Sequence, residues 1–340
     1  MLAQLCASPD PIIRYKALTF ILGKDPLSPE AREIQAEIPA SPRVQLLLSD
    51  RDTSGKIPFH PYTKWQGAHW VLTCLADIGY PPGDPSLLPL RDQVYAWFFA
   101  EDHIQEIHDR TGLNRQVRMH ASMEGNALFA SLVLGLENGR TEGLVERLLW
   151  AQWDDGGWNC DRHKEADTSS FFETLTPMRA LTKYAALSGD RRGRASVERA
   201  AEIFLSRRLF KRRRDGEVMR ADFLKLRYPC YWYYDILFGL KVMTEAGLIN
   251  DPRCQEALDV LESKQLPGGG FAAEGKHFVV FRKPGTFLHT GSRTDWGIVH
   301  RQKANEYITV DALAILRAAG RFKIPKDMQE KVKSQKKEKT

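Results

Sequence analysis

Apolar and polar positions recur along the chain with helical spacing. Five segments begin at a polar or aromatic residue, continue as a helix of small and apolar residues, and close at a glycine. These segments span residues 63–79, 124–139, 172–189, 231–247 and 306–320. Successive closing glycines lie 50 to 73 residues apart, which suits one helix pair and its loop. The pattern therefore predicts an all-α chain of repeated helix pairs.

Other helices are predicted between these five, which we call the inner helices. The first inner helix is expected over 57–80 and the fourth over 228–247, and outer helices are expected over 90–99, 144–152, 195–209 and 252–264. Near the N-terminus, Pro11, Pro29 and Pro42 indicate helix starts, because proline is well tolerated in a first helical turn. Residues 271–301 are expected to form a long loop or hairpin that packs over a pocket mouth.

The stretch 152–161 predicts a hinge between two helices. Apolar residues such as Leu148 and Leu149 lead to a glycine pair, and Trp158 is expected to pack across the turn before the next helix begins. A similar but less complete stretch, Pro267 to Phe271, follows Gln265. Turn signals also occur at 52–55 and 215–216.

The hinge resembles the Q-x-x-D-G-G-W element of the terpene cyclase and protein prenyltransferase superfamily. The matching positions are Gln152, Asp155, Gly156, Gly157 and Trp158. In that family the glutamine and the tryptophan tie the end of an outer helix to the loop that leads into an inner one. The resemblance implies an α/α toroid of about five to six helix hairpins. We expect a helical cap over 1–43, the toroid over 44–322, and a charged, disordered tail over 323–340.

Composition narrows the class of protein. A hydrophobic fraction of 43% supplies a sizeable core, no run of eighteen apolar residues occurs, and the first residues do not read as a signal peptide, so a soluble cytoplasmic protein is predicted. The five cysteines are an odd number and widely spaced, which favours reduced thiols. The net charge of +6 gathers in 207–214 and 326–339, and we expect solvated segments there rather than a specific nucleic-acid site. A helical partner or a homo-oligomer is left open.

Acidic residues occupy the first turns of the inner helices. If these helices point the same way around a ring, their first turns converge on one mouth, and Glu173, Asp235 and Glu124 are the predicted catalytic acids. An acid in a first turn is also favoured by the helix dipole alone. Glu173 could equally form a capping box with Ser170. The residues predicted to bind substrate are Trp65, His120, Asn126, Phe171, Trp232, Tyr233, Glu306, Asp311 and Trp296.

Three functions suit such a pocket. The resemblance implies acid/base chemistry on an apolar or isoprenoid-type small molecule in a central cavity, with aromatic faces stabilising positive charge. Carbohydrate hydrolases and lyases also use α/α toroids, and the third alternative is a non-catalytic toroid that binds a partner protein. No cofactor is predicted. Protein prenyltransferases bind zinc through Asp, Cys and His, so zinc is a minor alternative, with Cys160, Asp161 and His163 as its ligand candidates.

Overall fold

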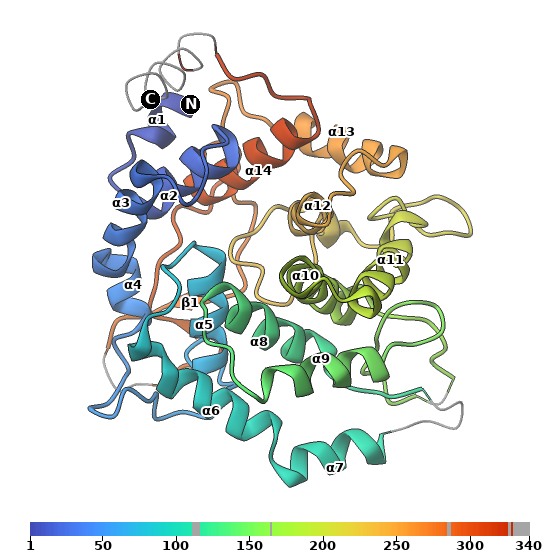
Figure 1. The fold of residues 1–340 in the computed structure, drawn as a ribbon. Coiled ribbons are helices and arrows are strands. Elements are labelled where there is room, and N and C mark those ends of the chain that lie inside the picture. Colours follow the sequence, from blue (N-terminus) through green and yellow to red (C-terminus); the bar gives the residue numbers. More distant parts are fainter. Residues whose placement is uncertain (111–115, 164, 284–286, 326–327, 329–340) are drawn as a thin grey trace.

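The computed structural model describes residues 1–110, 116–163, 165–283, 287–325 and 328 (Figure 1). The predicted all-α class is confirmed. The five inner helices are α5 (Ala68–Asp77), α8 (Ala121–Val133), α10 (Phe171–Ser188), α12 (Ile236–Glu245) and α14 (Glu306–Ala318). The four outer helices are α6 (Leu88–Phe98), α9 (Thr141–Trp150), α11 (Arg191–Leu205) and α13 (Gln255–Ser263). Most of the predicted tail, 323–340, lies outside the described residues.

The described residues also form shorter elements. The N-terminal ones are α1 (Leu2–Cys6), α2 (Pro11–Lys16), the π-helical η1 (Ala17–Ile21), α3 (Pro29–Glu37) and α4 (Pro42–Leu47). Helix α7 (Glu101–Asp109) follows α6, and four short 3₁₀ turns are η2 (Ile38–Ala40), η3 (Pro85–Leu87), η4 (Ala221–Leu224) and η5 (Pro252–Cys254). Two parallel strands, β1 (Val279–Val280) and β2 (Gly291–Ser292), pair within the long loop after α13.

The inner helices pack in chain order. Helix α5 contacts α8, α8 contacts α10, α10 contacts α12, and α12 contacts α14. Helix α14 then packs against α2 and η1. Lys16, the last residue of α2, lies 4.0 Å from the carboxylate of Asp77 at the end of α5. Figure 1 shows these helices following one another around the middle of the molecule, with the outer helices outside them. The N-terminal helices and α14 are therefore neighbours.

Several predicted helix ends need correction. Helix α8 ends at Val133 rather than near Gly139, and Gly135 takes the left-handed conformation that closes it. Helix α5 begins at Ala68 rather than near residue 57, since Pro58 and Pro61 interrupt the preceding stretch. Elsewhere the closing glycines 79, 189, 247 and 320 all have positive φ, as a glycine beyond a helix C-terminus should.

The hinge holds three elements together. The Gln152 side-chain amide donates to the carbonyl of Gly156 at 2.6 Å and to that of Ser196, in α11, at 2.9 Å. The indole of Trp158 is fully buried and donates to the carbonyl of Leu148, in α9, at 2.9 Å. The end of one outer helix is thus tied both to its own loop and to the next outer helix.

The stretch at 265–271 repeats part of the hydrogen bonding of the hinge. Within the hinge, the amide of Trp158 donates to Thr174 Oγ1, and in the repeat the amide of Phe271 donates to Thr309 Oγ1. The Gln265 side chain again donates to a carbonyl four residues on, that of Gly269, at 3.2 Å. The interpretation of this stretch as a less complete copy of the hinge is therefore confirmed at the level of individual hydrogen bonds.

The two glutamines offer a matched comparison. Gln152→Ala is expected to lower the free energy of unfolding by about 1–3 kcal/mol, because it removes the two hydrogen bonds that the side-chain amide donates to the carbonyls of Gly156 and Ser196. Gln265→Ala removes a single exposed bond and should cost less than about 1 kcal/mol. Urea unfolding of both variants measures the difference, and equal losses would show that the link to α11 contributes nothing.

Candidate functional site

Glu173 does not cap its own helix. Ser170 is the N-cap residue of α10, as predicted, but the predicted capping box is absent. The Glu173 carboxylate instead turns to the start of α8, where Oε2 accepts from the amide of Ser122 at 2.8 Å. Its other oxygen lies 3.5 Å from His120 Nδ1. The predicted acid and the predicted substrate-binding histidine are thus brought together.

Cys160 joins this pair. The ligand atoms of His120, Cys160 and Glu173 all lie within 4.8 Å of one another. Burial, and then the negative charge of Glu173, raise the pKa of the Cys160 thiol to about 12. Asp161 and His163 lie apart from this group and bond to each other at 2.6 Å. The three residues predicted as zinc ligands are therefore not brought together. Cys160 lies with His120 and Glu173, whereas Asp161 and His163 lie with each other.

Glu124 is buried beside the same end of α8. It pairs with Arg147 at 3.0 Å and lies 3.5 Å from His103, while its Oε2 has no hydrogen-bond partner among the described residues. Together with His120 it lines a pocket of about 360 Å³ whose walls include Tyr62 and Trp97.

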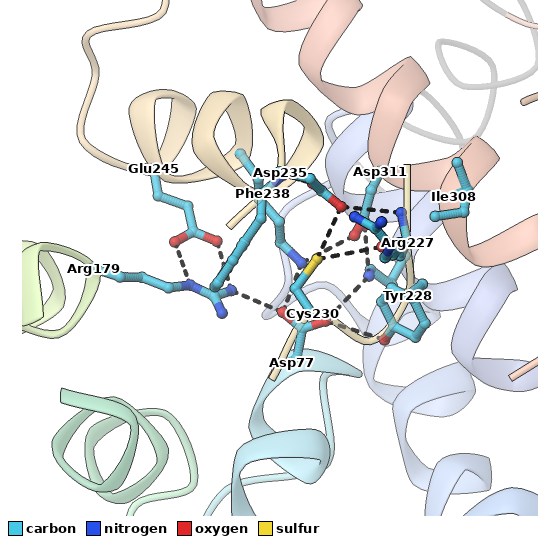
Figure 2. A network of polar contacts seen from close by, with 12 residues as sticks. Asp77, Arg179, Arg227, Tyr228, Cys230, Asp235, Phe238, Glu245, Ile308 and Asp311 are labelled. Carbon is cyan, nitrogen blue, oxygen red and sulfur yellow. Dashed lines mark hydrogen bonds and ion pairs between the residues drawn. The ribbon is translucent and has the colours of Figure 1, made fainter. Parts of the chain in front are cut away.

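Asp235 caps a helix. It is the N-cap of α12, accepting from the amide of Phe238 at 2.9 Å, and it also accepts from the amide of Arg227 at 3.0 Å. Burial raises the pKa of Asp235 to about 6. The thiol of Cys230 lies 3.4 Å from it, so protein groups surround the carboxylate (Figure 2).

The predicted aromatic and polar wall is divided among several places. Trp65 stacks on Tyr231 at 3.8 Å between ring centroids, while Trp232 and Tyr233 stack on each other at 4.4 Å. Tyr233 also lies edge-on to Trp65 at 6.2 Å between ring centroids, and Asn126 donates to the carbonyl of Tyr231, so these members are brought together. The remaining members have separate neighbours: Phe171 packs on Phe204 and Tyr234, Trp296 packs on Tyr228 and Tyr307, and Glu306 accepts from Ser8.

A charge network fills the middle of the inner helices. Asp77, at the end of α5, accepts from Arg179 of α10 at 2.9 Å (Figure 2). It also accepts from Lys241 of α12 at 2.6 Å. Asp311 of α14 pairs with Lys16 of α2 at 2.6 Å and with Lys241 at 3.1 Å. Glu245 pairs with Arg179 at 2.7 Å. Three acids and three bases are therefore paired here, and Asp311 is a member of this network.

Two cavities meet this network. The inner one, of about 40 Å³, has room for little more than water. The other, of about 480 Å³, lies where the inner helices end, and we call it the end pocket. Asp77, Arg179 and Lys241 line both cavities and so separate them. Apolar residues around the end pocket include Tyr15, Phe20, Leu27, Tyr80, Phe129 and Val133.

The end pocket was not anticipated from the sequence, although a signal for it exists. Lys241 is a single charge inside the apolar stretch Ile236 to Met243, and Lys16 directly precedes the largely apolar stretch Ala17 to Leu22. A charge buried in such a helix needs a partner of opposite sign. This requirement predicts a charge network around Lys16 and Lys241, and residues of that network line the end pocket.

A comparison of this chain with known protein families, with curated proteins and with solved structures finds no match. Across the described residues, no helix combines the length and the apolar character needed to cross a membrane.

Proposed function

We propose that the chain is an α/α toroid of the terpenoid cyclase and prenyltransferase type. Two observations support the proposal. The inner helices contact one another in order, and α14 meets α2 and η1, as closure of a ring requires. The hinge that carries the family resemblance also recurs in part, since Gln152 and Gln265 each donate to the carbonyl four residues on.

We further propose that this toroid binds an apolar, isoprenoid-type small molecule in the end pocket. The observation that carries the proposal is the pocket itself, because its volume of about 480 Å³ falls in the usual range for small-molecule sites. Phe20 and Leu27 at its edge are 50% and 68% exposed, although large apolar side chains are more often buried. An apolar ligand would cover both.

The charges around the pocket favour an anionic head group. The pocket is lined by three basic residues, Arg179, Lys183 and Lys241, and by two acidic ones, Asp77 and Glu245. The acids are already held by Arg179, whose bonds to them measure 2.7–2.9 Å. A phosphate or carboxylate near Lys183 would therefore meet an excess of positive charge, while the isoprenoid chain would lie against Phe129 and Val133.

Calorimetric titration with farnesyl phosphate, and with farnesol to isolate the head group, tests this function. Farnesyl phosphate is expected to bind more tightly than farnesol. Val133→Trp fills the pocket and should weaken binding at least about tenfold, since one lost contact of 1.4 kcal/mol has that effect. Val218→Trp, on an exposed residue that does not line the pocket, is the matched control and should bind as the wild type does.

Two results would contradict the proposal. One is the absence of binding by both compounds to the folded wild-type chain. The other is binding that Val133→Trp leaves unchanged, which would place the ligand outside the end pocket. A carbohydrate site has less support, because hydrolysis needs two available carboxylates, whereas Asp77 and Glu245 in this pocket are both paired.

A further inference from the structure

Two loops meet beside the start of α10. The end pocket lies at the other ends of the inner helices. Arg118 and Asn159 form a parallel β-bridge, and the amide of Met119 donates to the carbonyl of Asn159 at 3.2 Å. The indole of Trp153 fixes the first loop further by donating to the carbonyl of Val117 at 2.8 Å. Cys160 directly follows Asn159, and His120 directly follows Met119, whose amide bonds to Asn159. Their side chains are therefore positioned by the backbone.

Glu173 supplies the third side chain from a rigid element. It lies in the first turn of α10 and is buried, and the amide of Ser122 holds its Oε2. The other oxygen remains directed at His120 Nδ1, 3.5 Å away. A hydrogen bond that orients a ligating carboxylate in this way is a common feature of metal sites.

We propose that His120, Cys160 and Glu173 form a binding site for a divalent transition metal of the zinc type. Imidazole, thiolate and carboxylate are the three side-chain groups that bind Zn²⁺ in proteins. Ligands 2.0–2.3 Å from a tetrahedral ion lie about 3.3–3.8 Å apart. The His120–Glu173 separation of 3.5 Å already fits, and the three ligand atoms lie within 4.8 Å of one another, so small side-chain movements close the site.

The fourth position would face solvent. The His120 side chain is 43% exposed, whereas Glu173 is almost completely buried, so an ion bound here would be open on one side. Three protein ligands and an open position are typical of zinc sites that bind water or substrate. The site thus provides for an exchangeable ligand as well as an ion.

A metal-free cysteine nucleophile is a poorer interpretation of the same three residues. Reactive cysteines have a lowered pKa and lie near positive charge. Cys160 instead lies beside the Glu173 carboxylate, which carries a negative charge. A bound dication would reverse this local effect and stabilise the thiolate.

Cobalt titration of the full chain tests the site, with Co²⁺ as the spectroscopic substitute for Zn²⁺. The expected result is one ion per chain, with the near-ultraviolet absorption of a thiolate–cobalt bond. Cys160→Ser should abolish that absorption, and Glu173→Gln should weaken binding at least about tenfold, because loss of a hydrogen-bond partner of a ligand alone costs that much and Glu173 is itself a ligand. Competition by Zn²⁺ should remove the absorption in the wild type.

Matched controls locate the site. Cys6→Ser changes another partly buried thiol, and His163→Asn changes a histidine of the neighbouring loop that is not in the cluster, so both should bind Co²⁺ as the wild type does. Folded wild-type chain that gives no thiolate–cobalt absorption would overturn the proposal without any variant. Absorption that survives in Cys160→Ser would also overturn it. The inference does not depend on the end pocket, because farnesyl phosphate binding and Co²⁺ binding are measured separately.

Discussion

Asp77→Asn is expected to lower the free energy of unfolding by about 3–5 kcal/mol. The side chain keeps its volume but loses the charge that accepts from Arg179 at 2.9 Å and from Lys241 at 2.6 Å. It also accepts from the hydroxyl of Tyr228, and Lys16 lies 4.0 Å away. Removing one partner from a buried ion pair leaves an uncompensated charge, and this is the most costly way to change such a network.

Urea unfolding measures the loss, and an exposed pair provides the control. Glu146 and Arg192 lie 2.7 Å apart with both side chains more than half exposed, so Glu146→Gln should cost less than about 1 kcal/mol. If Asp77→Asn cost no more than Glu146→Gln, the network would contribute no more than a surface pair. The end pocket would then lack a fixed floor.

The loss of stability caused by Asp77→Asn should depend on pH. The cations Lys241, Lys16 and Arg179 outweigh burial and hold the pKa of Asp77 well below its ordinary value. A carboxylate with a lowered pKa contributes its stability fully above the pKa it has in the unfolded chain, about 3.9, and loses it as the pH falls further. The difference in stability between wild type and Asp77→Asn should therefore be constant near pH 7 and narrow below about pH 4.

Local signals in the sequence predicted most of the fold. Helices α3 and α6, for example, begin within two residues of the predicted starts, because proline and helical periodicity act over a few residues. Helix α12 begins at Ile236, later than expected, since its start is set by the capping carboxylate of Asp235. The packing of α14 against α2 joins residues nearly three hundred positions apart in the chain, which no local pattern encodes.

The candidate sites were less predictable, because their chemistry depends on pairing in space. Glu173 and His120 were both named from the sequence, but a bond to the amide of Ser122, in another helix, decides where the carboxylate points. Asp311 was assigned to a substrate pocket, and the structure pairs it with Lys16 and Lys241. Residue type was enough to select candidates, whereas their partners could be found only with the helices assembled.

Gly156→Ala is expected to be the most damaging change in the hinge, at about 2–5 kcal/mol of unfolding free energy. Gly156 has a φ of +105°, a conformation that side chains disfavour. A Cβ atom there would also lie only 2.4 Å from the carbonyl oxygen of Arg199, in α11. That oxygen belongs to a helix backbone and cannot move away alone, so the variant should separate the hinge from α11.

Gly216→Ala isolates the conformational part of this effect. Gly216 has a φ of +73°, and nothing lies within 4 Å of the position its Cβ would take. It should therefore cost only the left-handed strain, about 1–2 kcal/mol. The additional loss in Gly156→Ala, about 1–3 kcal/mol, measures the close approach of the hinge to α11. Equal losses in the two variants would mean that this approach is not needed for stability, and the hinge would then join α9 to α10 without fixing the next outer helix.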